Sequence, residues 1–112
     1  AWREWTGLPM VFAVWAARRD YAEQQPDQVW AVQQSFRQSL TASLEQVDEV
    51  AARAAAFEPF DAATLATYFR ALDFRLGERQ LEGVREFTRR SALAGAVPAD
   101  AALQLMGDDT GA

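Results

Sequence analysis

Thr6, Gly7, Leu8 and Pro9 are the residues in this sequence that most directly suggest chemistry. A threonine followed by glycine can present a hydroxyl group and backbone amides to an anionic ligand, because glycine lets the backbone approach closely. The same residues also suit an ordinary turn at the entrance of a strand, and the pattern alone favours that interpretation. We still treat Thr6–Pro9 as a candidate binding stretch.

Other polar groups suggest weaker sites. Arg18 and Arg19 could hold a carboxylate through paired N–H donors, but a solvated end of a strand explains them better. Glu45, Asp48 and Glu49 resemble a carboxylate cluster, yet without histidine an acidic helix surface explains them better than a metal site. Two further groups fit the core face and the solvated face of helices: Tyr68–Arg70 and Arg89–Arg90.

The composition limits what the chain can do. Histidine, cysteine and lysine are absent, and all eleven basic residues are arginine. The common nucleophiles, metal ligands and neutral-pH bases are thus missing, so we predict no catalytic residue and no metal ligand within the chain. A net charge of −5 argues against a general nucleic-acid binder. No apolar run reaches the roughly 18 residues that a membrane span needs.

The element that must position Thr6–Pro9 is the apolar run over residues 8–15. A short continuous run without alternation favours a strand that is buried on both faces, with Pro9 at its beginning. A helix is the competing interpretation for the second half of the run. Because one strand cannot form a sheet, we expect the chain to be the C-terminal part of a larger α/β protein.

The remainder of the sequence has helical periodicity and predicts helices over residues 27–41, 44–56, 61–72 and 78–94. Ser43 with Gln46 fits a capping box, and Asp61 fits an N-cap. Gly95 is a plausible terminator of the last long helix. A short final helix is predicted within residues 98–106, followed by a frayed tail over 107–112.

A family resemblance adds to these inferences. The segment Glu4–Tyr21 resembles the W-x-x-x-TGLPFVFA-x-W-x-A-R signature of chorismate dehydratase, an enzyme of the futalosine route of menaquinone biosynthesis. Tyr68–Gly77 and Gln80–Phe87 are also similar to the family's C-terminal region. Met10 stands where phenylalanine is common, a departure that a core tolerates well.

The resemblance implies an α/β parent fold with two lobes, similar to type II periplasmic binding proteins. Residues 1–112 would form the C-terminal portion of this two-lobed domain, mostly α-helical with one buried return strand at about 8–15, and without a complete second domain. It also implies that chorismate is dehydrated to 3-[(1-carboxyvinyl)oxy]benzoate without a cofactor, by catalytic side chains outside this chain. The residues expected to contact the substrate here are Thr6, Gly7, Leu8, Pro9 and Phe12.

The expected partner is therefore a small-molecule substrate, chorismate, with no nucleic acid and no membrane, and the expected compartment is the cytoplasm. A homodimer stays open. Three alternatives remain. Dihydroxynaphthoate synthase of the same pathway shares the fold, and so would a non-catalytic solute-binding protein. A small helical interaction domain would instead be self-sufficient, with residues 8–15 packed as a helix or paired with a partner chain.

Overall fold

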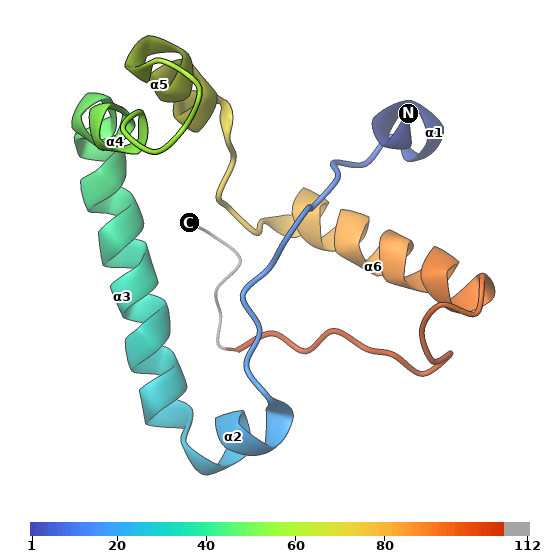
Figure 1. The fold of residues 1–112 in the computed structure, drawn as a ribbon. Coiled ribbons are helices and arrows are strands. Elements are labelled where there is room, and N and C mark those ends of the chain that lie inside the picture. The colour runs from blue at the N-terminus through green and yellow to red at the C-terminus, as the bar shows by residue number, and fades with distance from the viewer. Residues whose placement is uncertain (107–112) are drawn as a thin grey trace. The chain divides into compact units, whose positions relative to one another are not determined.

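The computed structural model describes residues 1–106 of the 112-residue chain. This described part is mostly helical and contains no strand (Figure 1). It divides into two compact units, one of residues 17–74 and the other of residues 1–16 together with the chain from residue 75 onward. The helices within the described residues are α1 (Trp2–Thr6), α2 (Arg19–Gln24), α3 (Pro26–Glu45), α4 (Val47–Ala54), α5 (Ala62–Ala71) and α6 (Glu78–Leu93).

The unit of residues 17–74 is built around the packing of α4 on α5. Its core consists mainly of small side chains: Ala51, Leu65 and Ala66 are only 0%, 7% and 4% exposed. Small residues at the contact let two helix axes approach closely. At the surface of the same pair, Arg70 Nη2 lies 2.8 Å from Asp48 Oδ1. Such an exposed ion pair contributes little, so the alanine-rich contact holds α4 and α5 together.

The helix predicted over 27–41 is α3, which begins at Pro26 and continues to Glu45. Proline suits the first helical position because its missing N–H is not needed there. The capping box predicted at Ser43 is wrong. Ser43 lies inside α3, and the helix ends where the N–H of Gln46 donates to the Ser43 carbonyl at 3.2 Å. The helix predicted over 44–56 therefore begins only at Val47 and ends at Ala54.

The N-cap predicted at Asp61 is confirmed. Asp61 Oδ1 accepts the N–H of Thr64 at 2.7 Å at the start of α5. This backbone hydrogen bond, followed by one from the Thr64 side chain, lowers the pKa of Asp61 because both favour the charged carboxylate. The helix predicted over 61–72 is thus α5, which is shorter by one residue at each end.

The end of α6 is also confirmed, but the helix predicted after it is wrong. α6 ends at Leu93, and Gly95 follows with a φ of 76°, which glycine adopts without a steric penalty. Beyond residue 98, the N–H of Ala101 donates to the Pro98 carbonyl at 3.0 Å, which closes one turn that does not continue. The predicted tail over 107–112 lies outside the described residues.

The buried strand predicted over residues 8–15 is wrong. This segment is irregular and follows α1 in the chain (Figure 1), with Phe12 92% exposed and Trp15 84% exposed. It is not helical either, since the next helix begins at Arg19. A strand is held by hydrogen bonds to a neighbouring strand, and the described residues contain none that could supply them.

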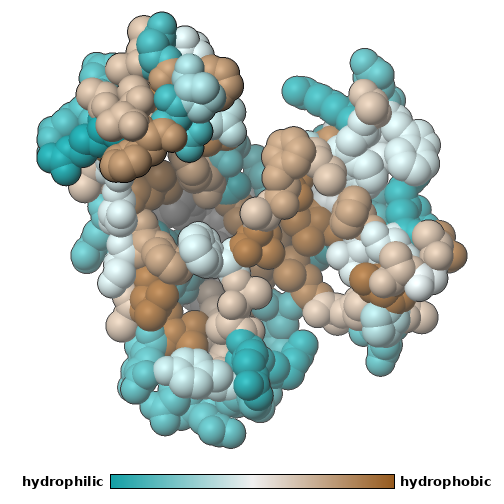
Figure 2. Space-filling view, viewed as in Figure 1, coloured by the Kyte–Doolittle hydropathy of each residue, from teal (hydrophilic) through white to brown (hydrophobic). Residues whose placement is uncertain are grey.

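Many other large apolar side chains lie at the surface, where brown residues are visible in Figure 2. Phe57 is 89% exposed and Trp5 is 68% exposed. Fully burying a side chain of this kind contributes about 1.5–3 kcal/mol. Much of the apolar surface of the described residues is exposed to solvent and does not make this contribution. No helix within residues 1–106 has the combination of length and apolar character that spanning a membrane requires.

Candidate functional site at the Thr6–Pro9 turn

A short helix and a glycine turn bring the candidate binding residues together. α1 ends at Thr6, and Gly7 follows with φ 70° and ψ 5°, in the left-handed region. The N–H of Gly7 donates to the Arg3 carbonyl at 2.8 Å and closes the last helical turn. The space beside Gly7 is open, because a Cβ built there would meet nothing within 4 Å beyond its chain neighbours.

The Thr6 hydroxyl group holds this turn closed. Thr6 Oγ1 donates to the Trp2 carbonyl at 2.9 Å and accepts the N–H of Leu8 at 3.1 Å. A hydroxyl has one donor and two lone pairs, so one lone pair remains for a ligand. The sequence predicts that backbone amides of this stretch could bind an anion. In this structure the N–H groups of Gly7 and Leu8 both donate hydrogen bonds within the turn.

Arg79 on α6 holds the carbonyl group of Gly7. Its Nη2 donates to the Gly7 carbonyl at 2.7 Å, while its Nη1 lies 2.9 Å from Glu82 Oε2. The guanidinium is planar and carries several donors, so one arginine can hold both partners at once. Within this unit, Arg79 thus links the turn to α6.

Gly83 lets the backbone of Pro9 lie directly against α6. Gly83 is buried, and a Cβ built on it would lie closer than 3.0 Å to the Pro9 carbonyl oxygen and 3.5 Å from its carbonyl carbon. Trp2 Nε1 donates to the same carbonyl at 3.2 Å. Only glycine leaves room for this approach, so a helix-interior glycine and an indole N–H together place Pro9.

An aromatic cluster of Trp2, Trp5 and Phe87 packs α1 onto α6. The Trp2 ring makes edge contacts with Trp5 and Phe87, at centroid distances of 6.0 and 5.9 Å. The guanidinium carbon of Arg90 lies 3.8 Å from the Trp5 ring centroid, a cation–π contact. Arg90 also bonds Glu86 at 2.6 Å. The cluster therefore supports the helix that carries Thr6.

Two strong hydrogen-bond donors also act on Glu86. Arg89 and Arg90 both bond its carboxylate, and these hydrogen bonds hold the pKa of Glu86 at about 2. The same interaction raises the pKa of Arg89. The carboxylate therefore stays charged at neutral pH, which keeps Arg90 in place over Trp5.

A comparison with known families identifies the family of this chain. A family model described as menaquinone biosynthesis matches residues 1–93. The chain belongs to this family. The matched range runs from α1 to the end of α6 and so includes the turn, Arg79 and Gly83. It also fits the resemblance to chorismate dehydratase that Glu4–Tyr21 and the later segments carry.

The remaining residues singled out in this family member's sequence lie apart from the turn or in the other unit. Phe12 belongs to the exposed segment after the turn. Arg18 pairs with Asp20, with its Nε 3.1 Å from Oδ1. In the unit of residues 17–74, Asp48 pairs with Arg70 and Glu49 pairs with Arg53 at 2.7 Å. Within residues 1–106, no three acidic, histidine or cysteine side chains are grouped so that they could hold a metal ion.

Neither Arg79 nor Gly83 stands out in the sequence as a site residue. Arg79 is one of eleven arginines, and its contact with Gly7 bridges 72 positions of the chain. Gly83 does leave a signal, because glycine inside a helical pattern costs stability and often marks a close contact. That signal identifies a close approach but not the residue that approaches.

Proposed function

We propose that this chain is part of a chorismate dehydratase. Such a hydro-lyase removes water from chorismate, whose ring loses its hydroxyl group and a hydrogen, and releases 3-[(1-carboxyvinyl)oxy]benzoate. Membership of the menaquinone biosynthesis family over residues 1–93 supports this pathway assignment. The specific reaction is suggested by the Glu4–Tyr21 signature.

In this proposal the chain contributes binding and positioning groups. Its Thr6–Pro9 turn borders the substrate, with Leu8 and Phe12 as apolar contacts. The observation that favours this role is the open space beside Gly7 combined with the unused lone pair of Thr6 Oγ1. The groups that remove the proton and assist the leaving hydroxyl lie outside this chain, and the reaction uses no cofactor.

The parent architecture that we propose is the two-lobed α/β fold, of which residues 1–112 form the C-terminal portion. The exposed apolar side chains of this segment, such as Phe12 at 92%, support a covering structure. Within this proposal the protein acts in the cytoplasm on a small molecule, without nucleic acid or membrane, and a homodimer is compatible with it.

The test is a turnover assay with the full-length protein. Purified protein is incubated with chorismate, and the aromatic enol-ether product is followed by chromatography and mass spectrometry, with and without a chelator. We expect stoichiometric conversion that survives chelation. Binding of chorismate without conversion would indicate a solute-binding protein, and failure to bind or convert it would exclude the dehydratase.

A variant pair links the activity to the turn. Thr6→Val removes a hydroxyl that makes two hydrogen bonds, at 2.9 and 3.1 Å. We expect it to lower kcat/KM by an amount equivalent to about 1 kcal/mol. Glu49→Ala, in the other unit, is the control and should keep full activity. If Thr6→Val is folded and fully active, the turn is structural only.

A further inference from the structure

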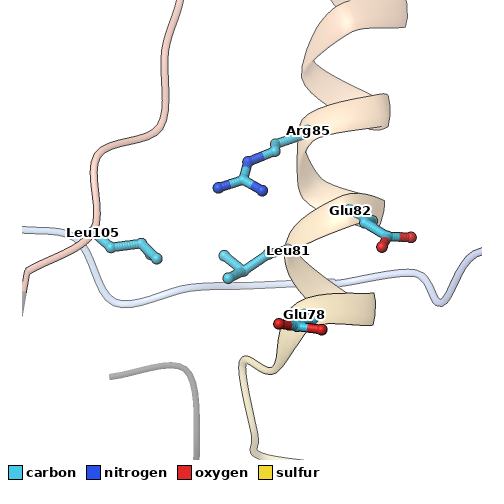
Figure 3. Close-up of a pocket in the computed structure, with 5 residues that line it drawn as sticks. All are labelled: Glu78, Leu81, Glu82, Arg85 and Leu105. Carbon is cyan, nitrogen blue, oxygen red and sulfur yellow. The ribbon is translucent and has the colours of Figure 1, made fainter. Parts of the chain in front are cut away.

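A pocket of about 310 Å³ lies beside α6, and none of the residues Thr6–Pro9 lines it. Its volume is at the lower end of the range for small-molecule sites, roughly 300–1,000 Å³. The pocket is lined by Glu78, Leu81, Glu82 and Arg85 from α6 and by Leu105 from the segment after it (Figure 3).

The middle of the pocket is apolar. Leu81 is only 3% exposed and forms its floor, and Leu105 points toward it from the opposite side (Figure 3). Two leucines that face each other offer dispersion contacts to a ligand body of a few carbon atoms. This part of the pocket carries no charge of its own.

The flanking groups carry opposite charges. Among residues 1–106, neither the Arg85 guanidinium nor the Glu78 carboxylate has a hydrogen-bond or ion-pair partner. Arg85 extends toward the Leu81 side of α6, whereas Glu82 points to the other side of the helix (Figure 3). Glu82 is paired with Arg79 at 2.9 Å, so its charge is already compensated. The uncompensated charges of the pocket are therefore one cation and one anion.

The spacing of these two charges suits a small ligand. Arg85 and Glu78 are seven residues apart on one helix, which places their Cα atoms about 10.5 Å apart along its axis. An anion without a cationic group would be attracted by Arg85 but repelled by Glu78. A cation without an anionic group would be attracted by Glu78 but repelled by Arg85. A molecule with both charges at opposite ends satisfies both residues.

We propose that this pocket binds a small amphoteric molecule. Its carboxylate bonds Arg85, its apolar body lies on Leu81 and Leu105, and its protonated amino group bonds Glu78. The proposal is independent of the dehydratase activity, because it uses different residues and a different ligand chemistry.

Three probes of similar size test this arrangement: benzoate, benzylamine and 4-(aminomethyl)benzoate. Each is titrated into the full-length protein at low ionic strength, and binding is measured by calorimetry or by ligand-observed NMR. The variants are Arg85→Gln and Glu78→Gln. Arg89→Gln is the matched control, because Arg89 is an arginine of the same helix that does not line the pocket.

We expect 4-(aminomethyl)benzoate to bind most tightly, with saturation in the millimolar range. Arg85→Gln should weaken this probe and benzoate by roughly two- to fivefold, the size expected for an exposed charge pair. Glu78→Gln should weaken the same probe and benzylamine by a similar factor, and should tighten benzoate. Arg89→Gln should change none of the three.

The proposal is overturned if the amphoteric probe binds no better than benzoate and benzylamine, or if both pocket variants behave like Arg89→Gln. Chorismate, which carries no amino group, should not displace 4-(aminomethyl)benzoate at equal concentration. Displacement would also contradict the proposed selectivity. Turnover of chorismate, measured separately, reports on the proposed function alone.

Discussion

Replacing Gly83 with alanine tests whether the backbone of Pro9 lies against α6. Two effects of opposite sign compete. Alanine is favoured over glycine inside a helix by about 1 kcal/mol. The added methyl group, however, would lie closer than 3.0 Å to the Pro9 carbonyl oxygen, and overpacking of this kind costs about 1–3 kcal/mol.

The geometry decides which effect wins. The obstructing atom is a backbone oxygen, which cannot rotate away as the end of a long side chain can. It is also held by Trp2 Nε1 at 3.2 Å, so its displacement would weaken a second interaction. We therefore expect Gly83→Ala to lower the free energy of unfolding by up to about 2 kcal/mol.

The measurement is urea unfolding of the full-length protein, followed by tryptophan fluorescence. Ser91→Ala on the same helix is the control, because it raises helix propensity without adding atoms and should be neutral or slightly stabilising. If Gly83→Ala stabilises the protein by about 1 kcal/mol, helix propensity acts alone and the close approach of Pro9 is refuted. In the proposed enzyme, Gly83→Ala should also reduce turnover, because the turn moves with Pro9.

Three further predictions concern other residues. Gly7→Val should destabilise the turn by about 1–2 kcal/mol, because the φ of Gly7 is 70°. It should also reduce kcat/KM far more than Glu49→Ala does. A Gly7→Val variant with wild-type stability would contradict the prediction. Asp61→Ala should lower the melting temperature, because it removes the N-cap hydrogen bond of α5, and an unchanged melting temperature would show that the cap is dispensable. The pKa of Glu86 is about 2 against an ordinary 4.5, so its stabilisation is complete above pH 4.5 and is lost as the pH falls toward 2. The stability difference between wild type and Glu86→Gln should shrink over that window, and a constant difference would contradict it.

The long helices could be predicted because their apolar periodicity extends over several turns. α5 and α6 agree with the predicted bounds to within one residue at each end, and Asp61 and Gly95 mark two of those ends. α1 and α2 could not be predicted in this way, because five and six residues make fewer than two turns. At Ser43 the sequence predicts the start of a helix that the structure does not have. The local capping pattern is not used there, because the helical hydrogen bonds of α3 continue past Ser43.

The candidate site was only partly predictable for a related reason. Gly7 could be identified because a threonine followed by glycine before an apolar run is a local signal, and its positive φ confirms the need for that residue. The partners of the turn are not local. Arg79 and Gly83 reach it through the packing of α6, and no pattern near residue 7 specifies which distant side chain will bond its carbonyl.

Residues 8–15 connect the site to the proposed parent fold. Their sequence favours burial on both faces, yet Phe12 and Trp15 are 92% and 84% exposed in the described chain. Burying each such side chain would contribute about 1.5–3 kcal/mol, so contact with a covering part of the proposed parent would add substantial stability. The segment begins within the Thr6–Pro9 turn, which means that the same contacts would also fix the turn. We therefore infer that, in the proposed two-lobed parent, covering of this segment and organisation of the binding turn occur together.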